Sequence, residues 1–138
     1  MKRILVVEDE PAIAFGLQLD LKSEGYDVEI ESDGESALQR ARKEAFDLIL
    51  LDVMLPRKDG FEVCRELRRG GSKTPVIMLT AKAQDADIFA GWQSGVSSYL
   101  TKPFNPRELL TFVQRIFESL DHGAGGGDDD LGGPVWEV

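Results

Sequence analysis

Cysteine and histidine are nearly absent from this sequence. Its 138 residues contain one cysteine, Cys64, and one histidine, His122. A single cysteine excludes an internal disulfide framework and fits a reducing compartment, so we expect a cytoplasmic protein. Cys64 shares a helical face with Phe61 and Leu67, which predicts a core position rather than a reactive thiol. His122 has no neighbouring His or Cys ligand and is expected to be a solvated tail residue.

Long hydrophobic runs and an excess of basic residues are also missing. No stretch approaches the roughly 18 apolar residues of a membrane helix, and no signal-peptide pattern follows Met1. The formal net charge is −9, with 16 Lys and Arg against 25 Asp and Glu. This balance argues against direct binding of nucleic acid through phosphate neutralisation. We therefore expect neither nucleic acid nor membrane as a partner of this chain.

The length favours a single domain, expected to span residues 1–120. Residues 121–138 form an acidic, Gly-rich tail without Lys or Arg, which we expect to be disordered. The tail ends in Val135–Val138, a segment that a peptide-binding groove could capture, although a disordered end is the simpler interpretation.

Five apolar, β-rich runs predict the strands of a sheet. They are Arg3–Val7, Tyr26–Glu31, Phe46–Leu51, Pro75–Leu79 and Ser97–Leu100. Within three of them, the segments Ile4–Val7, Leu48–Leu51 and Val76–Leu79 are continuously apolar rather than alternating. Continuous runs are typical of strands that are buried on both faces of a parallel sheet.

Amphipathic segments alternate with these strands. The first helix is expected to begin at Pro11, to bury Ile13, Leu17, Leu19 and Leu21, and to end at Gly25. The later apolar faces are Ala37, Leu38 and Ala41; Phe61, Cys64 and Leu67; Ile88 and Trp92; and Leu109, Phe112, Val113, Ile116 and Phe117. Their boundaries are marked by Asp33-Gly34, Gly70-Gly71, Gly95 and Asn105-Pro106. The alternation predicts an open α/β sheet with right-handed crossovers and helices on both faces.

Polar side chains follow four of the predicted strands. Glu8-Asp9 follows the first, Asp52 the third, Thr80 the fourth and Thr101-Lys102-Pro103 the fifth. Ligands of open α/β sheets bind beyond the carboxyl ends of the strands, so we expect these side chains to converge. Three crowded carboxylates either raise their pKa values or hold a cation, and ligands that are all oxygen suit Mg²⁺.

An ionised Asp52 beside a metal would be a competent nucleophile toward a phosphoryl group. Phosphoryl transfer requires positioning and neutralisation of charge, which Mg²⁺ and Lys102 could supply, with a hydrogen bond from Thr80. Singly, each residue has an ordinary explanation: acids after strands are common turn or cap residues, and lysines are usually solvated. The combination at adjacent strand ends favours a functional site.

Five motifs closely resemble those of two-component response-regulator receiver domains. They are Ile4–Glu10, Asp47–Pro56, Asp59-Gly60, Pro75–Ala81 and Tyr99–Phe104. The resemblance covers residues 2–120 and implies a flavodoxin-like doubly wound parallel sheet of order 2-1-3-4-5. It also implies that Asp52 accepts a phosphoryl group, with Glu8, Asp9, Asp52 and the backbone carbonyl of Met54 as Mg²⁺ ligands.

The resemblance further implies a conformational switch. Thr80 and Lys102 would contact the phosphoryl group, and Tyr99 would turn inward as Thr80 is drawn toward it. The Lys102–Pro103 bond would be cis, and Met54 and Lys82 would tune the lifetime of the phosphorylated state. The donor would be a sensor histidine kinase or a phosphotransfer protein. The surface of the fourth helix, fifth strand and fifth helix would then control a downstream partner or an output domain.

The chain departs from the receivers that dimerise and bind DNA. Those carry an acidic pair before the switch aromatic and basic residues on the fourth and fifth helices. The corresponding positions here are Ser97-Ser98, Ile88 and Phe112. We therefore expect a monomer or weak dimer, and no symmetric dimer through this face when beryllofluoride is added, which sedimentation would test.

Other functions fit the sequence less well, and we expect the chain not to be an enzyme. Phosphatases of the haloacid dehalogenase type need a second acid two residues after the nucleophile, where this chain has Met54. Glu8-Asp9-Glu10 would repel the phosphate of a flavin, and the P-loop pattern is absent. The remaining alternative is a receiver-like binding module that works without phosphorylation, although the intact acids, Thr80 and Lys102 argue against it.

Overall fold

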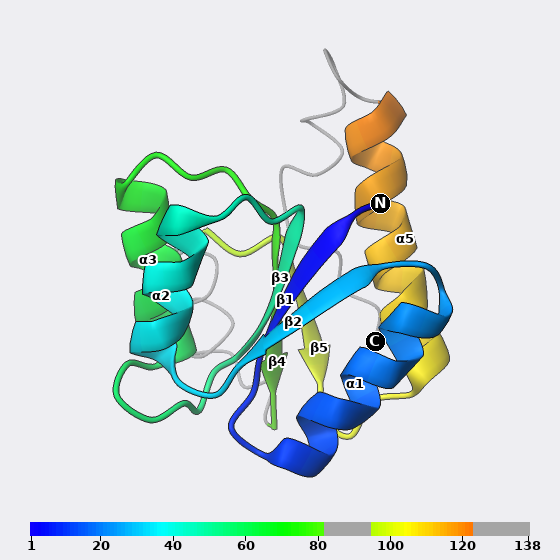
Figure 1. The fold of residues 1–138 in the computed structure, drawn as a ribbon, viewed down its shortest axis with the longest axis horizontal. Coiled ribbons are helices and arrows are strands. Elements are labelled where there is room, and N and C mark those ends of the chain that lie inside the picture. Colours follow the sequence, from blue (N-terminus) through cyan, green and yellow to red (C-terminus); the bar gives the residue numbers. More distant parts are fainter. Residues whose placement is uncertain (82–94, 123–138) are drawn as a thin grey trace.

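A five-stranded parallel sheet forms the middle layer of the computed structural model, which describes residues 1–81 and 95–122 (Figure 1). The strands are β1 (Arg3–Val7), β2 (Asp27–Glu31), β3 (Leu48–Asp52), β4 (Val76–Thr80) and β5 (Ser98–Thr101). Their order is β2-β1-β3-β4-β5, and all four pairings are parallel. This confirms the predicted flavodoxin-like sheet.

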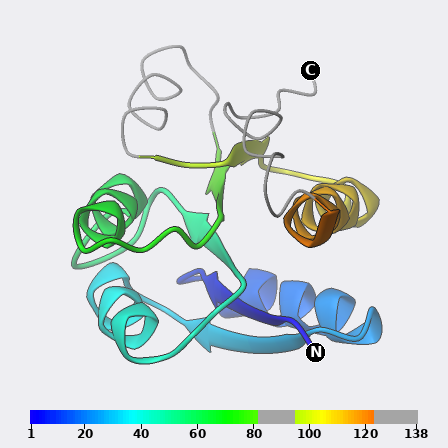
Figure 2. The ribbon, with the colours of Figure 1, turned by 90° about the horizontal axis from the view of Figure 1, so that it is seen from above.

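Helices cover both faces of the sheet. They are α1 (Pro11–Ser23), α2 (Gly34–Lys43), α3 (Gly60–Arg69) and α5 (Pro106–His122). Figure 2 shows α1 and α5 on one face and α2 and α3 on the other. The predicted fourth helix with Ile88 and Trp92 lies outside the described residues, as do Lys82 and residues 123–138. None of the helices in the described parts is long and apolar enough to cross a membrane.

Alternate strand residues enter two separate cores. In β1, Ile4 and Val6 pack with α1 and α5, whereas Leu5 and Val7 pack with α2 and α3. The three continuous apolar runs are therefore buried on both sides, as predicted. The thiol of Cys64 is fully buried in the second core, which confirms the prediction for that residue.

The strands that carry the site extend further than predicted. Asp52 and Thr80 are the last residues of β3 and β4 rather than the first residues beyond them. The ladder continues because the next backbone amides still find partners: Val53 donates to the Leu79 carbonyl at 2.9 Å, and Lys102 to the Thr80 carbonyl at 2.7 Å. The functional side chains thus stand on paired backbone, which holds them more rigidly than a free loop would.

Two other predictions need correction. Leu19 was expected in the core, but its side chain is 70% exposed. Leu17 and Leu21 are buried. Leu19 is two positions from each of them and therefore points to the opposite side of the helix. Helix α5 also continues through His122, so Asp121 and His122 belong to the helix rather than to a tail.

Candidate functional site

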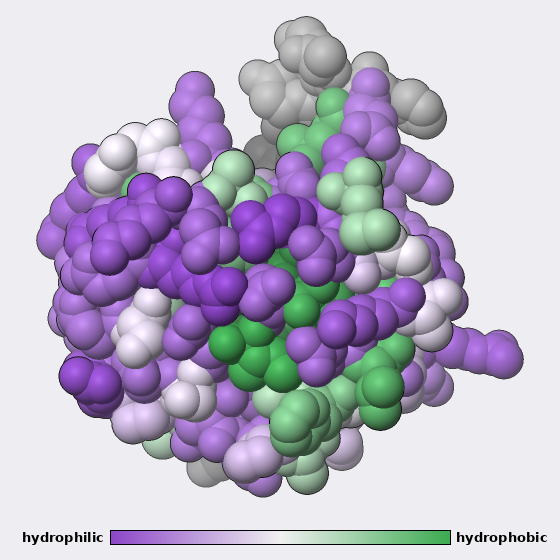
Figure 3. All heavy atoms as spheres, in the orientation of Figure 1, coloured by the Kyte–Doolittle hydropathy of each residue, from purple (hydrophilic) through white to green (hydrophobic). Residues whose placement is uncertain are grey.

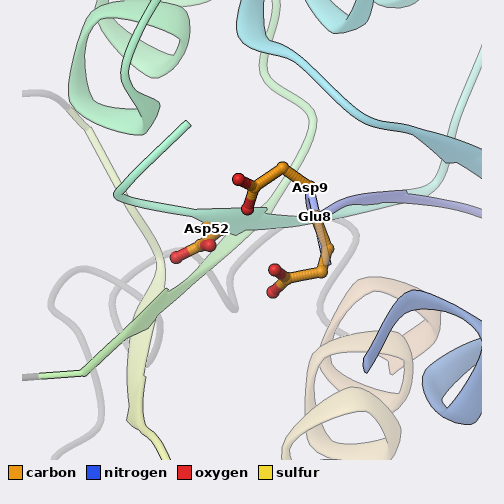
Figure 4. Close-up of side chains that lie close together, drawn as sticks. All are labelled: Glu8, Asp9 and Asp52. Carbon is orange, nitrogen blue, oxygen red and sulfur yellow. The ribbon is translucent and has the colours of Figure 1, made fainter. Parts of the chain in front are cut away.

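Three carboxylates converge at the carboxyl edge of the sheet. Glu8 and Asp9 follow the end of β1, and Asp52 ends the neighbouring β3, so the parallel register brings the three side chains together (Figure 4). One carboxylate oxygen from each lies within 4.8 Å of the others. Glu8 and Asp52 are 1% and 4% exposed, whereas Asp9 is open to solvent. The predicted acidic residues therefore form one cluster.

Lys102 supplies the positive charge of this cluster. Its Nζ lies 2.8 Å from Oε1 of Glu8 and 3.2 Å from Oδ2 of Asp52. The other oxygen of Glu8 accepts the backbone N–H of Glu10 at 3.1 Å. A buried carboxylate is costly unless it is paired and hydrogen-bonded, and both conditions are met for Glu8.

The pKa values reflect this balance between burial and charge. Burial raises the pKa of Glu8, and the hydrogen bond from Lys102 works against that increase. Burial alone would lower the pKa of Lys102, but its hydrogen bond to Glu8 and the charge of Asp52 raise it. The ammonium is therefore held in its charged form beside the two buried acids.

The donor set fits Mg²⁺. All three clustered side chains offer carboxylate oxygens, and the open side of the cluster at Asp9 leaves room for water and phosphate oxygens. The predicted fourth ligand, the carbonyl of Met54, belongs to the loop that follows Asp52. The side chain of Met54 is 74% exposed, and its backbone N–H donates to Oδ1 of Asp52 at 3.4 Å.

Gly60 allows helix α3 to start in close contact with the backbone of Asp52. A Cβ on Gly60 would lie 2.3 Å from the backbone oxygen of Asp52, which is closer than real Cβ contacts. The N–H of Gly60 donates to the Val53 carbonyl at 2.9 Å, and the carboxylate of Asp59 caps the helix by accepting the N–H of Glu62. The Asp59-Gly60 motif therefore positions the backbone that carries Asp52.

The residues of the predicted switch lie on β4 and β5. Thr80 and Tyr99 are both buried, at 5% and 3% exposure. The ring of Tyr99 points into the core beneath α3, with its centroid 6.4 Å from that of Phe61. The Lys102–Pro103 peptide bond is cis, as the resemblance implies.

Of the positions compared with dimerising receivers, Ser98 and Phe112 are buried. The ring of Phe112 belongs to the core between the sheet and α5, so this position offers the surface neither charge nor apolar area. Ile88 lies outside the described residues. The expected absence of a charge-paired dimer stays a prediction.

Apolar surface lies beside the acidic cluster. A depression of about 450 Å³ is lined by Ile13, Ala81, Lys102, Pro103 and Phe104. Helix α1 adds Phe15 and Leu19, which are 60% and 70% exposed, and Figure 3 shows hydrophobic surface over this helix. The depression was not predicted, because its residues come from α1, the end of β4 and the segment after β5.

The sequence alone did not reveal that Lys102 pairs with Glu8. Both residues were predicted at the site, but a lysine at a strand end is usually solvated, and nothing in the spacing indicates its partner. One signal could have found the pair. Glu8 directly follows the continuously apolar run Ile4–Val7, so its side chain is expected to be buried, and a buried acid requires a cation such as Lys102.

Comparisons with known proteins agree with this geometry. Residues 4–114 match the response regulator receiver domain family. The chain is 50% identical over 115 residues to the alkaline phosphatase synthesis transcriptional regulatory protein PhoP of Bacillus subtilis, covering 83% of this chain and 48% of that protein. The chain spans about half the length of the curated relatives it matches.

Solved structures show the same fold. The receiver domain of the Francisella response regulator 1452 superposes with a TM-score of 0.82 at 32% identity, covering 86% of this chain and 98% of that one. The receiver domain of the sensor histidine kinase PA1611 of Pseudomonas aeruginosa PAO1 has a TM-score of 0.76 at 39% identity, covering 83% and 95%. That structure has a magnesium ion coordinated in its active-site cleft.

Proposed function

The chain belongs to the family of response regulator receiver domains, and on this premise we propose that Asp52 accepts a phosphoryl group in a Mg²⁺-dependent reaction. The observation that carries the proposal is the surroundings of Asp52. Its carboxylate is buried, faces the Lys102 ammonium at 3.2 Å, and clusters with Glu8 and Asp9. Few other functions require a nucleophilic carboxylate, an ammonium group and two further acids at one sheet edge.

In the transfer, an oxygen of Asp52 forms a bond to phosphorus. The bond from phosphorus to the nitrogen of a phosphohistidine breaks, and its electron pair stays on that nitrogen. Glu8, Asp9, Asp52 and the carbonyl of Met54 would hold Mg²⁺, which when bound neutralises charge on the phosphoryl oxygens. Lys102 already lies within reach of Asp52 and would contact the same oxygens.

Phosphorylation would then be sensed by Thr80 and Tyr99. The new group adds negative charge and acceptor oxygens at Asp52, and the Thr80 hydroxyl would donate to one of them. The inward position of Tyr99 against Phe61 is the arrangement that this contact would favour. Phosphorylation can shift the population from the inactive to the active conformation only by the difference between its interaction free energies with the two conformations.

Partner recognition has two supporting features. The apolar depression is lined by Ile13, Phe104 and Lys102 among others, and Phe15 and Leu19 are further exposed apolar residues of α1. A kinase or phosphotransfer protein must bring its histidine to Asp52, so we place its docking surface here. Because the relatives are about twice as long, we propose that the signal passes to an output domain or to a separate protein.

Intact-mass spectrometry with a small phosphodonor and Mg²⁺ tests the proposal. We expect one added phosphoryl group on the wild type, none with a chelator and none on Asp52→Asn. Asp59→Asn is the matched control, because it changes an acid of the same loop whose capping role asparagine can fill. If the wild type gains no adduct while a known receiver is modified in the same mixture, the phosphorylation-independent binding module becomes the better account.

A further inference from the structure

Gly34, the first residue of α2, packs against the loop that joins Asp52 to α3. Its N–H donates to the carbonyl of Pro56 at 3.2 Å. A Cβ on Gly34 would lie 1.8 Å from the carbonyl oxygen of Lys58 and 2.7 Å from the carbonyl carbon. Both atoms are backbone, so no side chain can rotate away, and any larger residue at Gly34 must displace the loop.

The loop segment 56–58 is tightly constructed. The N–H of Lys58 donates to the same Pro56 carbonyl at 2.8 Å, and Arg57 between them has a φ of 73°. A left-handed conformation is unfavourable for a residue with a side chain and persists only where surrounding contacts hold it. A push on the Lys58 carbonyl would therefore move this turn as a unit.

Ion pairs attach the same turn to both neighbouring helices. The Nζ of Lys58 pairs with Glu66 of α3 and lies 3.7 Å from Glu35 of α2. The guanidinium of Arg57 lies 3.7 Å from the carboxylate of Asp33, the residue that caps α2. These contacts fix the end of the loop opposite to Asp52.

The other end of the loop carries the site. Met54 donates its N–H to Asp52 and is the residue whose carbonyl we propose as a metal ligand. Because Gly60 has no Cβ, helix α3 can start close to the carbonyl of Asp52. The loop thus has a glycine contact near each end. Gly60 lies against Asp52 at its start, and Gly34 lies against Lys58 near its end.

We propose that Gly34 is a positioning residue for the metal and phosphoryl site, although it touches none of the reacting groups. Its missing side chain sets how closely the 53–59 loop lies to α2 and, through that loop, where the Met54 backbone stands. This inference rests on the proposed function for its consequence, but the contact between Gly34 and Lys58 can be tested without it.

The test compares Gly34→Ala with Gly16→Ala. Gly16 also lies in a helix, and nothing comes within 4 Å of a Cβ there. Amide NMR spectra without metal should show shifts for residues 53–59 in Gly34→Ala and not in Gly16→Ala. Titration with MgCl₂, followed at the Met54 amide, should give a Kd for Gly34→Ala weakened by about tenfold, as for other residues that support metal ligands.

A folded Gly34→Ala protein with a Kd within twofold of the wild type would overturn the inference and leave the proposed function intact. If the wild type itself does not bind Mg²⁺, the proposed function fails, while the metal-free shifts still decide whether Gly34 positions the loop. If Gly34→Ala does not fold, the comparison is repeated in trimethylamine oxide, which favours compact states. A variant that stays unfolded there would overturn the positioning role, because the contact would then support the whole fold.

Discussion

The Nζ of Lys102 lies 2.8 Å from Oε1 of Glu8, although 94 positions separate the two residues in the chain. The contact joins the ends of β1 and β5 across the carboxyl edge of the sheet, and the same ammonium reaches Asp52. Among the residues that the structure describes, Lys102 is the cation that pairs with both buried carboxylates. This arrangement suggests that Lys102 and Mg²⁺ stabilise the same cluster, with consequences for stability as well as for phosphorylation.

Lys102→Met should lower the free energy of unfolding by about 2 kcal/mol in metal-free buffer, because Glu8 and Asp52 lose their counter-charge. Addition of MgCl₂ should then stabilise the variant more than the wild type, since the ion replaces the missing ammonium. Urea unfolding with and without Mg²⁺ measures both effects. Arg3→Met is the matched control, as Arg3 is also partly buried and ion-paired but begins β1, at the end of the strand away from the acidic cluster and the 53–59 loop. Equal stabilisation of Lys102→Met and the wild type by Mg²⁺ would contradict this account.

The cap of α2 should make stability depend on pH. The carboxylate of Asp33 accepts the N–H of Ser36 at 2.7 Å, and this hydrogen bond lowers the pKa of Asp33 below its ordinary value of 3.8. A carboxyl group whose pKa is lowered in the folded state stabilises the fold at pH values above its ordinary pKa. This contribution is lost as the pH falls through the pKa of the folded state.

Asp33→Ala should therefore cost about 1 kcal/mol at neutral pH. Asp33→Asn keeps a capping oxygen but cannot ionise, so the difference between wild type and Asp33→Asn should shrink as the pH falls below 3.8. Urea unfolding of the three proteins at several pH values provides the measurement. A difference between wild type and Asp33→Asn that is constant with pH would show that the charge of Asp33 does not matter.

Cys64 should be unreactive in the native protein. Its thiol is fully buried, and burial raises its pKa to about 11, so almost no thiolate is present at neutral pH. Labelling with a thiol reagent should be slow in buffer and should accelerate in urea as the protein unfolds. Rapid, complete modification of the native protein would mean that the core around α3 opens far more readily than its packing indicates.

Tyr99 should connect phosphorylation to the surface. Tyr99→Ala removes the ring that contacts Phe61, whereas Tyr99→Phe keeps it and loses only the hydroxyl. We expect both variants to take up a phosphoryl group, and Tyr99→Ala to lose the phosphorylation-dependent NMR shifts of α5. If Tyr99→Ala shows the same α5 shifts as the wild type, the aromatic ring has no part in the switch.

The sequence predicts the sheet and the acidic cluster well because both depend on local patterns. Continuous apolar strands followed by Glu8-Asp9 and Asp52 are sufficient to place three carboxylates at one edge of a parallel sheet. The exact strand ends depend instead on pairing between distant segments, as for Thr80 with Thr101. The ends of β3, β4 and β5 were predicted one residue too early, whereas those of β1 and β2 were predicted correctly. The Lys102–Glu8 pair and the close approach of Gly34 to Lys58 also join distant parts of the chain, so no local pattern indicates them.

Chemical mapping of the phosphorylated residue tests the central claim most directly. Borohydride reduces an acyl phosphate on aspartate to homoserine, which peptide mass spectrometry locates in the chain. After incubation with phosphodonor and Mg²⁺, we predict homoserine at position 52 alone, and none when a chelator is present. Homoserine at Asp9 or at another acid, or an unchanged Asp52 in a protein that has gained a phosphoryl group, would contradict the assignment of Asp52 as the phosphoacceptor.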